Sequence, residues 1–373
     1  MHWVGTWSSA QQLTEPANRP PAPGLSESTL RQVVCVSQGG SRLRVRFSNE
    51  YGDAPITLRS ARVAASIAGS AIDPSSDRGL TFDGRSSAVV LAGGHLLSDP
   101  LDYALPPLAR VAVSIAFGKT PEALTGHPGS RTTSYLQLGE AARMDALPSA
   151  SMTEHWYFLA GIDVLADSST AAVVTLGDSI TDGRGSTTDG CDRWPDALAR
   201  RLRQNAATSR VAVLNQGIGG NAVLGGGLGP PALQRFRRDV LEPSGVRWVV
   251  VLEGVNDIGA SRNPSVVGEL IDAYRGFIEL AHGHDVRVYG APILPFGGSQ
   301  YDSAEHEAAR QELNRFIRTR GAFDAVIDFD AAVRDPARPA WLLAEYDSGD
   351  HLHLNAAGYR AMAAAIDLSL FSK

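Results

Sequence analysis

Hydrophobic and polar positions follow two different patterns along the chain, and the pattern changes near residue 165. Before that point, apolar residues alternate with polar ones. In SRLRVRFSN (41–49), the side chains of Leu43, Val45 and Phe47 fall on one face and those of three arginines fall on the other. Alternation with a period of two predicts half-buried strands, which have one face against a core and the other in solvent.

A second alternating segment, RVAVSIAFG (110–118), places Val111, Val113 and Ile115 on a common face. Turn-forming pieces such as NEYGDAP (49–55) separate segments of this kind. Several short strands divided by turns predict an antiparallel β-sandwich. We assign this predicted domain to residues 1–165.

Beyond residue 170, continuous apolar runs alternate with segments of helical period. The runs are AAVVTL (171–176), VAVLNQ (211–216), RWVVVLEG (247–254), DVRVYGAPIL (285–294) and DAVIDF (324–329). Such runs are typical of parallel strands that are buried on both faces. Strands and helices in alternation predict a flavodoxin-like, doubly wound parallel sheet of about five strands, which we assign to residues 166–373.

The helical segments between these runs have one apolar face each. Trp194, Leu198 and Leu202 recur every four residues, as they would on one side of a helix. A final helix is predicted from a stripe near the carboxyl terminus, formed by Tyr359, Met362, Ile366 and Leu370. The whole chain is therefore expected to be an α/β protein with a β-rich N-terminal domain.

Composition restricts the function classes. The 373 residues, 43% of them apolar and 20% charged, are typical of a globular protein with two domains. A net charge of −6 argues against nucleic acid as a partner. No apolar run approaches the roughly 18 residues of a membrane span. The start MHWVGTWSSA lacks the features of a signal peptide, so the protein is expected to be cytoplasmic, or secreted with its leader already removed.

The chain contains two cysteines, Cys35 and Cys191, in segments assigned to different domains. Two isolated cysteines make neither a disulfide scaffold nor a metal-ligand cluster. We therefore predict two free thiols.

Candidate chemistry begins where the first parallel strand ends, in Gly177, Asp178 and Ser179. Open parallel sheets bind their ligands at this edge. One interpretation is a helix-capping turn, because aspartate and serine are ordinary helix-start residues. The other is that Ser179 is a nucleophile.

The next two strands end in groups that could stabilise an oxyanion. Gly217, Gly219 and Gly220 leave backbone amides uncovered after the second strand, and Asn256 offers a neutral amide after the third. Backbone N–H groups and amide side chains are the donors that a developing oxyanion needs. Together these residues place a nucleophile and two sources of donors at one edge of one sheet.

A serine nucleophile needs a base, and the segment DSGDHLHLNAAGY (347–359) supplies one. Asp350 and His353 are three residues apart, so the carboxylate can hold one imidazole nitrogen while the other faces Ser179. We interpret His351 as structural. A metal site at Asp-His-x-His would need a third ligand cluster, which the sequence lacks, and we expect no metal and no cofactor.

Four ordered blocks resemble the SGNH hydrolases, also called GDSL esterases and lipases. The blocks are GDSITDG (177–183), NQGIGGN (215–221), GVND (254–257) and DHLHLN (350–355). The Gly-x-Ser-x-Gly motif of the α/β-hydrolases does not occur. The β-rich N-terminal region resembles that of a bacterial subset of the family, in segments such as HWVGTWSSAQ (2–11).

The resemblance implies a role for each matching residue. Ser179 would be the nucleophile and, through its own N–H, the first oxyanion donor. Gly220 would give the second backbone donor, with Gly219 as the alternative, and Asn256 the side-chain donor. His353 would be the base, and Asp350 the acid that orients it.

The expected activity is therefore that of a serine esterase. Small residues in GGNAVLGGGLGPP (219–231) and PFGGSQYDS (295–303) indicate an open, mobile rim, which favours short acyl groups, acetyl first, with a carbohydrate as a possible alcohol. One alternative is a lipase or thioesterase that acts on longer acyl chains, which would need an apolar groove to hold the acyl chain. Another is a glycan-binding module with an accessory esterase, in which exposed aromatic residues stack on sugars: Trp3, Trp7, Trp156 and Tyr157.

Overall fold

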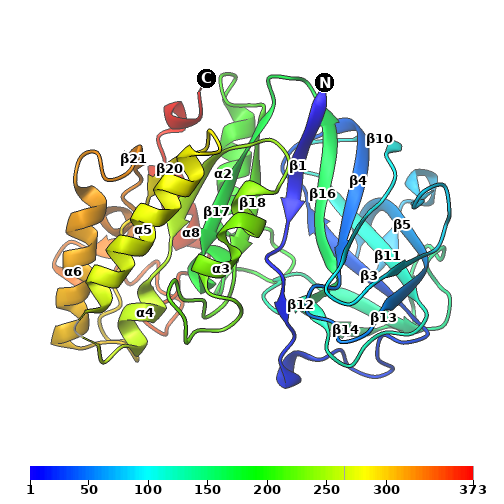
Figure 1. Cartoon of the computed structure of the whole chain (residues 1–373), viewed down its shortest axis with the longest axis horizontal. Helices are drawn as coiled ribbons and strands as arrows, with labels where there is room; N and C mark the ends of the chain where they lie inside the picture. Colours follow the sequence, from blue (N-terminus) through cyan, green and yellow to red (C-terminus); the bar gives the residue numbers. More distant parts are fainter. Residues whose placement is uncertain (264, 373) are drawn as a thin grey trace. The chain divides into compact units, whose positions relative to one another are not determined.

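The computed structural model describes residues 1–263 and 265–372 (Figure 1). The chain divides into two compact units. The first comprises residues 1–168 together with 188–190, and the second comprises residues 169–187 and 191–373. Among the described residues, none of the helices combines the length and the apolar character that crossing a membrane requires.

The first unit consists of antiparallel strands. Its strands are β1 (His2–Ser8), β2 (Gln12–Leu13), β3 (Ser28–Cys35), β4 (Gly40–Ser48), β5 (Ile56–Ala68), β6 (Ala71–Ile72), β7 (Arg78–Gly79), β8 (Ala88–Val90), β9 (His95–Leu97), β10 (Leu101–Leu105), β11 (Arg110–Phe117), β12 (Thr125–His127), β13 (Ser134–Leu138), β14 (Ser151–Thr153), β15 (Trp156–Tyr157) and β16 (Leu159–Ala166). Two short 3-10 helices, η1 (Pro16–Asn18) and η2 (Pro74–Ser76), lie between them.

Three sheets make up this unit. One has the order β1-β16-β4-β10, with β9 also paired to β4; the second has the order β14-β13-β3-β11-β5-β6, with β7 and β8 also paired to β5; the third is β15-β12-β2. The predicted antiparallel β-rich region is therefore confirmed. In β4 the alternation is as predicted: Leu43, Val45 and Phe47 are buried, while Arg44 on the other face forms an ion pair with Asp163 at 2.8 Å.

The central strand β11 departs from the half-buried prediction, because every residue from Val111 to Phe117 is buried. On the face that was expected to meet solvent, Ser114 lies against an arginine of the neighbouring strand β3. The fully buried Arg31 of β3 donates from Nε to the hydroxyl of Ser114 (2.8 Å) and from Nη2 to the carbonyl of Met144 (2.7 Å). Ser114, the small polar residue of β11, thus faces a buried guanidinium instead of solvent.

The aromatic residues proposed as sugar platforms belong mostly to the core. Trp156 and Tyr157 are 2% and 0% exposed, and Trp7 packs edge-on against Trp156 with ring centroids 4.9 Å apart. The ring of Trp3 is covered by the guanidinium of Arg44 at 4.4 Å. Three of the four rings are therefore closed to stacking on a sugar, while Trp3 is half-buried with Arg44 over one face, so the glycan-binding alternative loses most of the residues on which it depended.

The second unit contains a parallel sheet of five strands: β17 (Ala171–Gly177), β18 (Val211–Gly217), β19 (Val246–Leu252), β20 (Arg287–Gly290) and β21 (Ala325–Val326). Their order in the sheet is β18-β17-β19-β20-β21, and each neighbouring pair is parallel. Taken in chain order this is 2-1-3-4-5, the flavodoxin-like order. The predicted doubly wound sheet is therefore confirmed, with its topological switch beside β17.

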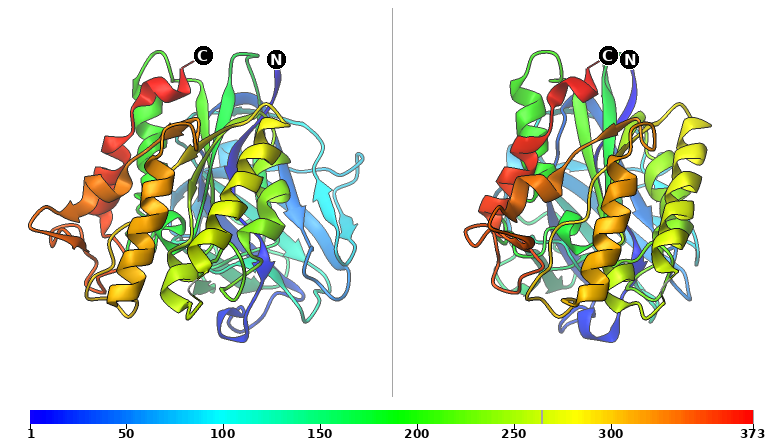
Figure 2. Two further views of the ribbon diagram at one scale, coloured as in Figure 1. Left: turned by 60° about the vertical axis from the view of Figure 1, so that its left-hand side comes forward. Right: turned by 90° about the vertical axis from the view of Figure 1, so that its left-hand side faces the viewer.

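Helices cover both faces of this sheet (Figures 1 and 2). One face carries α2 (Trp194–Gln204), α7 (Phe329–Val333) and α8 (Ala356–Ala365), and the other carries α3 (Ala232–Phe236), α4 (Val255–Ala260), α5 (Val266–His282) and α6 (Ala304–Arg318). The remaining elements are α1 (Ser179–Asp182), η3 (Arg237–Leu241), the hairpin β22 (Arg334–Asp335) with β23 (Arg338–Leu342), and η4 (Leu368–Phe371). Figure 2 shows α5 and α6 on the side of the sheet opposite α8.

Two predictions from the sequence need correction. The final helix was expected to continue through Leu370, but α8 ends at Ala365 and a separate 3-10 helix follows, because the Asp367 side chain caps it by accepting from the Ser369 N–H. The prediction of free thiols is wrong, since Cys35 and Cys191 are both disulfide-bonded.

Candidate active site

Ser179 lies where the chain turns from the first parallel strand into a helix. β17 ends at Gly177, and Ser179 is the first residue of α1. Asp178 caps this helix by accepting from the Ile180 N–H at 2.9 Å. The short helix stops at Gly183, which has a φ of +99°. The capping turn is therefore present, and it places Ser179, 6% exposed, directly after the carboxyl end of the strand.

His353 makes the hydrogen bond that a serine nucleophile needs. Its Nε2 lies 2.7 Å from the Ser179 Oγ, and its Nδ1 lies 2.7 Å from Asp350 Oδ2. A carboxylate can only accept, so Nδ1 carries the proton and Nε2 is left with a lone pair toward the serine hydroxyl. The three side chains that the sequence predicted as a triad thus form one continuous hydrogen-bonded chain.

The turn that carries His353 also fixes the orientation of its acid. Asp350 Oδ1 accepts the N–H groups of Leu352 (3.1 Å) and His353 (2.9 Å), which leaves Oδ2 for the imidazole. Burial by itself would raise the pKa of the Asp350 carboxyl, but the hydrogen bonds from the His353 backbone and ring outweigh it and lower the pKa to about 2. The carboxylate therefore stays ionised wherever an imidazole can act as a base.

His351 belongs to a second pair on the same turn. Its Nδ1 lies 2.5 Å from Asp347 Oδ2, and its ring meets the edge of Trp341 with centroids 5.5 Å apart. Asp347 also accepts the N–H groups of Gly349 and His351. This pair is separate from the contact between His353 and Ser179, as expected for a structural role.

The predicted oxyanion donors come from the loops after β18 and β19. Gly220 has a φ of +72°, a left-handed conformation that favours glycine, and a Cβ there would lie 3.0 Å from the side chain of Leu228. Asn256 is the second residue of α4, which begins after Gly254 with a φ of +109°. Asn256 Nδ2 donates to the carbonyl of Asn221 at 2.6 Å, which joins the two loops.

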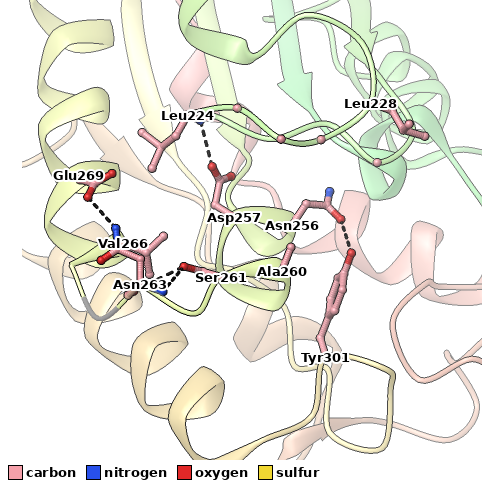
Figure 3. A pocket seen from close by; sticks show the side chains of 14 residues that line it. Leu224, Leu228, Asn256, Asp257, Ala260, Ser261, Asn263, Val266, Glu269 and Tyr301 are labelled. Carbon is pink, nitrogen blue, oxygen red and sulfur yellow. Dashed lines mark hydrogen bonds between the residues drawn. The ribbon is translucent and has the colours of Figure 1, made fainter.

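A pocket of about 520 Å³ opens beside these donors (Figure 3). Gly220 and Asn256 line it, whereas Gly219 does not. Its remaining lining combines glycines, a few apolar side chains and several polar ones: Leu224, Gly225, Gly226, Gly227, Leu228, Asp257, Ala260, Ser261, Asn263, Val266, Glu269 and Tyr301. Among the described residues that line it, the ionisable side chains are two acids and one tyrosine, with no basic residue.

Arg235, which no sequence pattern singled out, joins two of the four blocks and the residue that precedes a third. Its guanidinium is fully buried and donates to the carbonyls of Gly177 (3.0 Å) and Gln216 (2.7 Å). It also donates to Asn221 Oδ1 (2.9 Å) and Glu253 Oε1 (3.0 Å). Arginine in the segment QRFRRD has no distinguishing pattern, and only the fold reveals which of the three arginines is buried.

Several carboxyl groups surround Arg235, and its single positive charge cannot balance all of them when they are ionised. Glu253 and Asp178 are both buried, and the second carboxyl oxygen of Glu253 has no hydrogen-bond partner among the described residues. Burial raises the pKa of Asp178 to about 7, helped by the charge of Asp257 and opposed by the cap contact and Arg235. Burial, with the charge of Asp178, likewise raises the pKa of Glu253. The folded protein therefore retains a proton that the unfolded chain releases at lower pH.

This retained proton gives a pH-dependent stability. Since the folded pKa of Asp178 lies above its unfolded value of roughly 4, the stabilisation is complete below pH 4 and is lost as the pH rises through about 7. Replacing Glu253 with glutamine removes one of the two coupled acids. Relative to wild type, the variant should therefore become more stable as the pH rises from 4 to 7. The free energy of unfolding of the variant, minus that of wild type, should increase over this range.

Urea unfolding at several pH values measures this difference. Asp272→Asn is the control, because it removes one carboxylate whose side chain is 76% exposed. Parallel pH profiles for wild type and Glu253→Gln would show that the buried acids carry no extra proton.

Comparison with known proteins decides the family. A model of the GDSL-like lipase/acylhydrolase family matches residues 175–361, half of the chain, and this match spans the segments that carry Ser179, Gly220, Asn256 and His353. The chain belongs to this family. As a GDSL-like acylhydrolase, it is a hydrolase that acts on esters.

Solved structures similar to this acylhydrolase include a protein assigned to the G-D-S-L lipolytic family from Desulfitobacterium hafniense (20% identity, 52% of this chain and 97% of that one, TM-score 0.41). Another is a variant of an acetyl xylan esterase from Geobacillus stearothermophilus (18% identity, 52% and 92%, TM-score 0.41). A third is an α/β hydrolase from the metagenome of Lake Arreo (19% identity, 52% and 92%, TM-score 0.40). No curated protein matches the chain.

Proposed function

We propose that this acylhydrolase is a serine esterase that hydrolyses short-chain carboxylic esters, acetyl esters first, through a Ser-His-Asp triad and a covalent acyl-enzyme. The observation that carries the proposal is the hydrogen-bonded chain from Ser179 Oγ to His353 Nε2 and from His353 Nδ1 to Asp350 Oδ2, with both distances at 2.7 Å. This is the arrangement in which an imidazole can accept a serine proton and remain stabilised once it is charged.

In the proposed reaction, His353 Nε2 removes the Ser179 proton while the serine oxygen bonds to the ester carbonyl carbon. The carbonyl electron pair moves onto oxygen and forms a tetrahedral oxyanion. As the pair returns, the bond to the alcohol oxygen breaks, and the imidazolium gives its proton to that leaving group. A water molecule then repeats the sequence on the acyl-enzyme, with His353 as base, and releases the acid.

The Ser179 N–H, the Gly220 N–H and Asn256 Nδ2 are the proposed oxyanion donors. Ser179 begins a helix, where the first N–H groups have no partner inside the helix. The left-handed conformation of Gly220 and its place in the pocket beside Asn256 favour Gly220 over Gly219 as the second backbone donor.

The polarity of the pocket lining supports a short acyl group. Asp257 and Glu269 lie among its walls, together with Ser261 and Asn263 (Figure 3). Burying a long alkyl chain against carboxylates would remove their water without replacing its hydrogen bonds. The same polar groups suit a hydroxylated substrate, so we include esters of carbohydrates among the proposed substrates.

Chain-length profiling tests the proposed acyl specificity. With p-nitrophenyl esters of two to twelve carbons, we expect kcat/KM to be highest at two to four carbons and to fall at least about tenfold by eight, because each added methylene must enter a polar pocket. The acetyl thioester of the same length is the control for thioesterase activity. An optimum at eight carbons or more would replace this assignment with a lipase or long-chain thioesterase.

A further inference from the structure

The amide of Asn256 is held at both ends. Its Nδ2 donates to the Asn221 carbonyl at 2.6 Å. Its Oδ1 accepts from the Tyr301 hydroxyl at 2.9 Å, and Figure 3 shows this second contact. A main-chain carbonyl can only accept, so the nitrogen end of the amide must face Asn221 and the oxygen end must face Tyr301. An amide nitrogen has two N–H groups, and the second has no partner among residues 1–263 and 265–372.

The Tyr301 ring occupies space that α4 leaves for it. Gly259 lies one turn beyond Asn256 on this helix, and a Cβ at Gly259 would come within 2.2 Å of the Tyr301 ring. A larger side chain at position 259 would therefore displace the ring. Tyr301 is packed against the same helix that presents Asn256.

A histidine fixes the loop of Tyr301 to the end of that helix. His306 Nδ1 lies 2.8 Å from the Tyr301 carbonyl, and its Nε2 lies 3.1 Å from the carbonyl of Ser261, the residue that follows α4. The Tyr301 N–H is bonded in turn to the Ser299 hydroxyl at 3.1 Å. Burial raises the pKa of Tyr301, so its hydroxyl keeps the proton that it donates through neutral and mildly alkaline pH.

We propose that Tyr301 is a positioning residue that holds the Asn256 amide in the one orientation in which its second Nδ2 N–H can meet the oxyanion. The inference rests on the proposed function, since it assumes that Asn256 is an oxyanion donor. Asn221 completes the clamp from the other side, and its own side chain is fixed by Arg235. Neither Tyr301 nor Arg235 needs to touch the substrate to act in this way.

A double-mutant cycle on p-nitrophenyl acetate tests the proposal, with wild type, Tyr301→Phe, Asn256→Ala and the double variant. Asn256→Ala should lower kcat by about 100-fold or more, as the loss of an oxyanion donor does. Tyr301→Phe keeps the ring and removes one neutral hydrogen bond, so kcat should fall by about tenfold while KM stays within about twofold. In the Asn256→Ala background, the same change should have no further effect, because the group it positions is gone.

Tyr289→Phe is the matched control, since it also removes a tyrosine hydroxyl from a hydrogen bond, here to the Leu370 carbonyl. Its kcat should equal that of wild type. If Asn256→Ala keeps full kcat, the oxyanion role in the proposed function fails. If Asn256→Ala loses activity but Tyr301→Phe does not, or if Tyr301→Phe lowers activity equally in both backgrounds or changes only KM, the positioning role alone is overturned.

Discussion

Replacing Ser179 with alanine is expected to lower kcat for p-nitrophenyl acetate by about 10³-fold or more, toward the loss of roughly 10⁶-fold known for triad serines. The Oγ is the atom proposed to bond to the ester carbon, and alanine leaves no nucleophile in its place. The substitution removes only the hydrogen bond to His353, so the fold should persist. Steady-state kinetics, with circular dichroism to confirm folding, measure the effect.

Retained turnover in a folded Ser179→Ala variant would contradict the assignment. The Gly-Asp-Ser turn would then serve only as the cap that Asp178 makes on α1. The family and the fold would stand, because neither depends on which side chain attacks the ester.

Replacing Asp350 with asparagine should lower kcat by about 10³- to 10⁴-fold, with little effect on KM. Oδ1 is held by the N–H groups of Leu352 and His353, so the new amide must keep its oxygen there and turn its NH₂ toward His353 Nδ1. A donor at that position makes Nδ1 the acceptor and places the imidazole proton on Nε2. His353 would then present a proton to Ser179 where a lone pair is needed.

The chain supplies a matched control for this change. Asp347→Asn alters the second carboxylate on the same turn, which pairs with His351. Because this pair does not contact Ser179, kcat should fall by less than about tenfold. Equal losses in the two variants would mean that the turn as a whole matters and that Asp350 has no special role in orienting the base.

Hydrophobic pattern was sufficient to predict the sheet of the second unit. The segments that form β17, β18 and β19 are mostly apolar, because parallel strands are covered on both faces. The fourth run was predicted over 285–294, but β20 spans only Arg287–Gly290. Periodicity could not show this, because the residues that follow β20 are buried without being paired as a strand.

The candidate site was predictable where function needs unusual residues near strand ends. Serine, glycine, asparagine and histidine at such positions are conspicuous in a sequence. The role of Tyr301 could not be predicted in this way. Tyr301 lies 45 residues from Asn256 along the chain, within a segment that was interpreted only as the rim of the site. Arg235 was missed for a similar reason, since its partners come from three separate strand ends and arginine is usually a surface residue.

Covalent labelling can identify Ser179 as the nucleophile without relying on a substitution at that position. Wild-type enzyme is treated with a fluorophosphonate, which modifies an activated serine, and the adduct is located by peptide mass spectrometry while residual esterase activity is followed. We expect one adduct, on Ser179, formed in proportion to the loss of activity and absent in His353→Ala. Inactivation with the adduct on another residue, or full labelling of Ser179 with activity retained, would contradict this expectation.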